Sequence, residues 1–95
     1  MKLGMDTAGY YREVCKKHVE VCMEQIPALC NADGNNVKEI IKYVNNMYDC
    51  AMIIDRIHLG ELSHEEIEKI EVWEATNIEY TQKWVPKDWD EPEVK

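Results

Sequence analysis

The chain has 95 residues, of which 45% are hydrophobic, and it carries a formal net charge of −8. This length suits a single domain over residues 1–95 and is too short for two separate cores. The acidic balance argues against direct nucleic-acid binding, which uses clustered lysine and arginine, and no apolar run approaches the roughly 20 residues of a membrane span. We therefore expect a cytoplasmic protein whose cysteines are reduced thiols.

A first helix is predicted over about residues 7–29, after a flexible start at 1–5, because apolar side chains recur there at spacings of three and four. Asp6 or Thr7 can cap it. Pro27 lacks a backbone donor, so the regular helix is expected to kink or stop near Gln25, and one further turn is possible after it. The predicted inward stripe consists of Tyr11, Val14, Cys15, His18, Cys22, Ile26 and Leu29.

A second helix is predicted over about residues 36–59, ending at Gly60. Cys50, Ile53 and Ile57 widen its apolar face near the end, which indicates contact with the third helix or with another subunit. Its predicted seam consists of Val37, Ile40, Ile41, Val44, Met47, Tyr48, Ala51 and Ile54.

A third helix is predicted over about residues 63–84, starting at a capping box of Ser63 and Glu66. Its inward face also carries three polar residues, which either pair inside the fold or mark a break followed by an extended segment at 78–85. We expect the continuous helix. The polar residues are Glu74, Asn77 and Thr81.

The fold class is predicted to be all-α, an up-down-up three-helix bundle that ends in an irregular acidic tail over 86–95. The links between the helices are short, so neighbouring helices are expected to be antiparallel. The broad apolar face of the second helix also allows the bundle to form a homodimer.

Cysteines and one histidine share the face of the first helix. In an antiparallel hairpin turning near Asp33, Cys15 is expected to lie near Cys50 and His18 near Tyr48. A metal site is the least favoured reading, since the chain has no C-x-x-C pair; core packing comes first and a Cys15–Cys50 disulfide second. Cys30 alone is expected to be exposed. The metal alternative would use Cys15, His18, Cys22 and Cys50.

No motif in the sequence indicates an enzyme. The calcium-binding loop, the H-E-x-x-H zinc motif, the glycine-rich phosphate loop and the G-x-S-x-G turn are all missing from it. Glu74 is the single acid predicted to face inward. We expect no catalytic residue and no cofactor.

Acidic residues are concentrated in residues 61–95, which hold 11 of the 19 acids but only 4 of the 11 lysines and arginines. Such a surface suits a basic protein partner, including a nucleic-acid-binding protein whose site it would occupy in place of phosphates. Small acidic inhibitors encoded by phages share this size and charge. The likeness is limited to these two properties and indicates no family. The predicted partner-binding residues are Glu61, Glu65, Glu68, Glu79, Trp89 and Asp90.

The sequence thus favours a non-enzymatic regulatory protein, of which an inhibitor is one form. A charged helical face kept for solubility alone is the competing interpretation of the same residues. The alternative function is a bundle that binds a small ligand at Glu74, Asn77 and Thr81, or a metal at the cysteine and histidine group.

Overall fold

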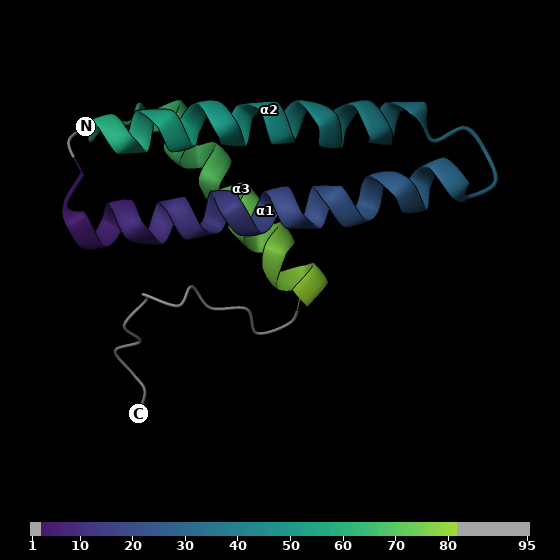
Figure 1. Ribbon diagram of the computed structural model, residues 1–95, viewed down its shortest axis with the longest axis horizontal. Coiled ribbons are helices and arrows are strands. Elements are labelled where there is room, and N and C mark those ends of the chain that lie inside the picture. Colours follow the sequence, from purple (N-terminus) through teal and green to yellow (C-terminus); the bar gives the residue numbers. More distant parts are fainter. Residues whose placement is uncertain (1–2, 82–95) are drawn as a thin grey trace.

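Three α-helices make up the computed structural model, which describes residues 3–81 (Figure 1). They are α1 (Met5–Asn31), α2 (Val37–Leu59) and α3 (His64–Thr81). No strand occurs in this part of the chain, so the all-α prediction is confirmed and the arrangement is consistent with a three-helix bundle. None of the helices described is long and apolar enough to cross a membrane. The predicted tail at 86–95 lies outside the described residues.

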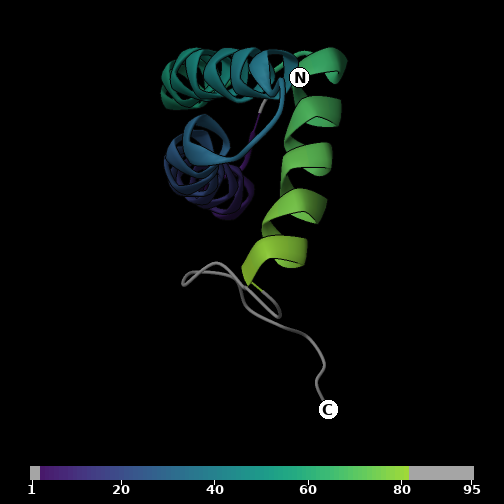
Figure 2. The same cartoon turned by 90° about the vertical axis from the view of Figure 1, so that its right-hand side faces the viewer.

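α1 and α2 form an antiparallel hairpin, and α3 lies across it. The first two helices run side by side in opposite directions, while α3 passes obliquely behind them in the view of Figure 1 and packs mainly against α1. When the hairpin is seen almost end-on, α3 runs along one side of the pair (Figure 2). The periodicity of the sequence does not specify this inclination.

The start of α1 differs from the prediction. The helix begins at Met5 with Gly4 as its N-cap, so Asp6 and Thr7 lie inside its first turn and do not cap it. Leu3 precedes the helix, and its backbone N–H donates to the carbonyl of Gly60 at 3.0 Å. This bond ties the beginning of the chain to the end of α2.

The predicted stop near Gln25 does not occur, because α1 continues through Pro27 to Asn31. Proline removes the hydrogen bond to the carbonyl four residues earlier, which here belongs to Met23. Met23 is 59% exposed and Pro27 is also exposed, so water can reach this carbonyl. Solvent therefore lowers the cost of the missing bond.

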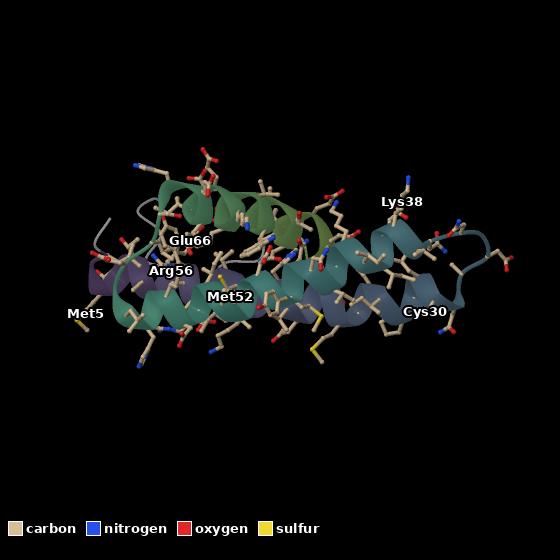
Figure 3. All side chains as sticks on the ribbon, turned by 90° about the horizontal axis from the view of Figure 1, so that it is seen from above. Met5, Cys30, Lys38, Met52, Arg56 and Glu66 are labelled. Carbon is tan, nitrogen blue, oxygen red and sulfur yellow. The ribbon has the colours of Figure 1, made fainter. Side chains whose placement is uncertain are left out.

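The link between α2 and α3 follows the predicted capping chemistry. Gly60 adopts a left-handed conformation with φ of 90°, and its N–H donates to Ile57 at 2.9 Å. Ser63 N–H donates to the Glu66 carboxylate at 2.7 Å, and Glu66 N–H donates to Ser63 Oγ at 3.2 Å, which confirms the capping box. Arg56 Nε lies 2.9 Å from Glu66 Oε2, and Figure 3 shows these side chains between α2 and α3.

The core forms where all three helices meet. The α1 positions predicted to be inward are largely right, since Val14, Cys15, His18 and Cys22 are buried. The buried cluster consists of Val14, Cys15, Cys50, Ile53, Ile57, Leu62, Ile70 and Trp73.

The seam predicted for α2 is wrong in its orientation. Val37, Ile41, Val44 and Tyr48 are exposed, and the buried residues of this helix are those that the sequence analysis assigned to a widened edge, Cys50, Ile53 and Ile57. α2 is apolar on two sides. Its periodicity reveals the longer stripe but cannot show which stripe meets α1 and α3.

Candidate functional site

A buried hydrogen-bond network around His18 connects the three helices. His18 of α1 is 1% exposed and Asn77 of α3 is 0% exposed, with 3.1 Å between His18 Nδ1 and Asn77 Oδ1. Asn77 Nδ2 donates to the Val14 carbonyl at 3.0 Å. On the other side of the ring, Asn46 Nδ2 of α2 lies 3.3 Å from His18 Nε2. The network therefore fixes α1 relative to both other helices.

The partners of His18 determine its proton position. The Asn77 amide oxygen only accepts, so Nδ1 carries the hydrogen and donates it, which leaves Nε2 to accept from Asn46. Burial lowers the pKa of His18, and the positive charge of Lys42 lowers it further, against the opposing effect of the Asn77 bond. The ring also stacks on Trp73, with centroids 5.4 Å apart. These contacts indicate a neutral structural histidine.

The three polar residues predicted to face inward on α3 are separated by the structure. Asn77 pairs with His18, as described above. Glu74 is half-buried, and burial raises the pKa of its carboxyl group. Thr81 lies in the last turn of α3, and its side chain is outside the described part. α3 remains helical to Thr81, which answers the question of a break at Asn77.

Three of the four thiols are buried. Cys15, Cys22 and Cys50 are shielded and Cys30 is exposed. A hydrogen bond between Cys15 and Cys50, together with burial, raises the pKa of Cys50, so the predicted proximity of these two residues is confirmed. Burial raises the pKa of Cys22 to about 11. All four are free thiols in the structure.

The other elements of the cysteine and histidine hypothesis find less support. Among residues 3–81, no group of three or more His, Cys, Asp or Glu side chains is placed to hold a metal ion. His18 lies beside Asn46, whereas its predicted neighbour Tyr48 is 66% exposed. The predicted neighbour of His18 is wrong by two residues because the inward face of α2 was assigned incorrectly, which also misplaced its seam.

A groove of about 610 Å³ lies between α2 and α3, directly beside the His18 network. Asn46 and Trp73 contribute to both features, so side chains of the network form the inner wall of the groove. Lys69 Nζ lies 3.5 Å from Asp49 Oδ2 at its margin. The lining residues are Lys42, Asn46, Asp49, Glu65, Glu68, Lys69, Val72 and Trp73. The sequence analysis did not find the groove, since its two walls are distant in the chain.

The predicted partner-binding acids are exposed, and two of them line the groove. These two are Glu65 and Glu68. Helical spacing continues the same face of α3 through Val72, which is 63% exposed, to Glu79. Glu61 precedes the helix and is also exposed. The predicted contributions of Trp89 and Asp90 lie outside the described residues.

No protein-family model matches the chain, and no curated protein or solved structure is significantly similar to it.

Proposed function

We propose that the protein is a non-enzymatic regulator that binds a basic partner protein along α3, with a lysine or arginine side chain of the partner entering the α2–α3 groove. The observation that supports this proposal is the combination of carboxylates and apolar surface in one groove. Glu65 and Glu68 supply negative charge, and Val72 and Trp73 supply apolar contact.

The lining of the groove has a net charge of −1, from three carboxylates against Lys42 and Lys69, which suits a cationic side chain. Asp49 is already paired with Lys69. Neither Glu65 nor Glu68 forms an ion pair within the described part of the chain. An arginine or lysine could place its apolar stem against Val72 while its charged end approaches these carboxylates.

Exposed charge pairs contribute only about 0.2–1 kcal/mol each, so the carboxylates would mainly accelerate association and select a basic partner. Most of the affinity would come from apolar surface, to which Val72 and the edge of Trp73 contribute. Binding is therefore expected to be faster at low salt, with a smaller change in the dissociation rate.

A small-molecule ligand is the second candidate, because the groove volume of about 610 Å³ falls within the usual range for such sites. Five of the eight lining residues are charged, which favours a polypeptide over an uncharged metabolite. Thermal stabilisation by a metabolite panel would support this candidate.

The test is affinity capture with three forms of the full chain. One form carries Glu65→Lys, Glu68→Lys and Glu79→Lys on α3. The matched control carries the same charge change elsewhere, at the exposed residues Glu24, Asp33 and Glu39.

Mass spectrometry should find a basic protein that is retained by the wild type and by the control but lost by the α3 variant. Loss from both variants would show that only net charge matters. Retention by both would reject α3 as the binding surface.

A further inference from the structure

The half of the α1–α2 hairpin near its turn has no buried residue. From Met23 to Asp49 every side chain is exposed or half-buried, and all the buried side chains of residues 3–81 lie outside this range. The range nevertheless contains Ile26, Leu29 and Ile40. Two helices alone cannot enclose a core, and α3 touches this half of the hairpin at residues such as Tyr43, whose hydroxyl lies 3.1 Å from that of Tyr80, without burying any of its side chains.

An apolar strip runs along the outer side of α2, which Figure 3 views from the side facing away from α1. At about 100° per residue, this strip lies roughly opposite the buried strip of Cys50, Ile53 and Ile57. No other described helix covers it. Its exposed members are Val37 at 56%, Ile41 at 52%, Val44 at 49%, Tyr48 at 66% and Met52 at 51%.

We propose that this outer strip of α2 is the interface of a homodimer, in which the α2 helices of two copies pack antiparallel about a two-fold axis. A strip that is apolar along most of a helix is self-complementary in this arrangement, since each end meets the opposite end of the second copy. The two-fold axis would pass near Met47.

The charges of α2 favour this antiparallel pairing. Beside the strip, the first half of α2 carries Lys38 and the second half carries Asp55. Lys42 and Asp49 instead line the α2–α3 groove, and Arg56 is paired with Glu66. Antiparallel packing therefore sets a positive residue against a negative residue, twice. With Ile41 placed against Met52 of the partner subunit, Lys38 lies beside Asp55 of the partner subunit. Parallel packing would oppose like charges.

The available area agrees with a reversible dimer. A helix of 23 residues is about 34 Å long, and a strip about 10 Å wide along it covers roughly 350 Å² of one copy. Two copies would together bury about 700 Å². This value is below the range of standard specific interfaces, so the dimer should be weak and should form only at high micromolar concentrations.

Sedimentation velocity of the full chain from about 5 to about 500 μM should show a monomer–dimer equilibrium. Val44→Glu should raise the dimer dissociation constant by at least about 30-fold, because the interface contains the substitution twice. The matched control is Val72→Glu on α3, which adds the same charge at a site of similar exposure and should leave the equilibrium unchanged.

A charge exchange tests the register. Lys38→Asp and Asp55→Lys should each weaken the dimer, and the double variant should restore it. Lys38 and Asp55 are about 26 Å apart along one helix, so restoration can come only from contact between copies.

Three results would overturn the proposal. The first is a monomer at every concentration, which is also the result expected if the chain's own remaining residues cover the strip. The others are equal effects of Val44→Glu and Val72→Glu on the equilibrium, and a dimer of the double variant that is weaker than the dimers of both single variants. Far-UV circular dichroism would verify that each variant folds. The proposal is independent of partner capture, which depends on α3, so either can fail alone.

Discussion

Replacing Asn77 with leucine should destabilise the protein through the loss of a specific buried pair. The substitution removes the oxygen that accepts from His18 Nδ1 at 3.1 Å and the amide that donates to Val14 at 3.0 Å. Leucine has a similar volume, so the effect is chiefly that of lost hydrogen bonds. His18 keeps its Trp73 contact but is left with an unsatisfied ring nitrogen in a site that is 1% exposed.

The magnitude follows from these contacts. Two hydrogen bonds of about 1 kcal/mol each, plus about 1–3 kcal/mol for the stranded polar group, give a loss of roughly 3–5 kcal/mol in the free energy of unfolding. Small domains are stable by only about 5–15 kcal/mol. The melting temperature should therefore fall by well over 10 °C, at about 4–8 °C per kcal/mol.

A double-mutant cycle isolates the pair. His18→Phe retains a ring that can stack on Trp73 and should by itself strand Asn77, whereas His18→Phe with Asn77→Leu leaves neither group unsatisfied. Urea unfolding followed by far-UV circular dichroism should show that the double variant costs less than the sum of the single variants. Additive losses, or an Asn77→Leu effect below about 0.5 kcal/mol, would refute the reasoning.

Further substitutions and conditions test other parts of the fold. Gly60→Ala should lower the free energy of unfolding by about 1–2 kcal/mol, because the φ of Gly60 is 90°. Gly9→Ala lies inside α1 with no atom near the added Cβ, so it should raise the free energy of unfolding by about 0.5–1 kcal/mol. Thermal unfolding measures both changes. Because burial lowers the pKa of His18 in the fold, the unfolded chain takes up the proton first. The stability contributed by neutral His18 should be complete above its ordinary pKa of 6.5 and lost as the pH falls below it, and His18→Phe should remove this part of the decline. A thiol reagent should label Cys30 rapidly and the other three cysteines only on unfolding; rapid labelling of Cys15 would contradict the packing.

Local chemistry explains why the helix limits near residues 59–63 were predictable. Gly60, Ser63 and Glu66 act within a few residues of one another, so the chain itself holds all the groups that end α2 and start α3. The buried face of α1 was predictable for a related reason. Its apolar and thiol side chains form a single stripe, with charged residues such as Lys16 and Glu20 outside it.

The environment of the candidate site was only partly predictable. The position of Asn77 on the inward face of α3 followed from helical spacing, and its burial confirmed that interpretation. Its partner did not follow, because His18 is 59 residues away and the angle between α1 and α3 decides whether their side chains meet. The α2–α3 groove depends on the same angle.

By itself, the sequence determined the three helices, the capping of α3, the burial of Cys15 and Cys22 on α1 and the concentration of acids on α3. Tertiary structure alone decided which of the two apolar sides of α2 enters the core. Helical periodicity is a property of one helix and is unchanged by rotation about its axis. Whether Val44 or Ile53 points inward depends on the surface that α1 and α3 together present to α2.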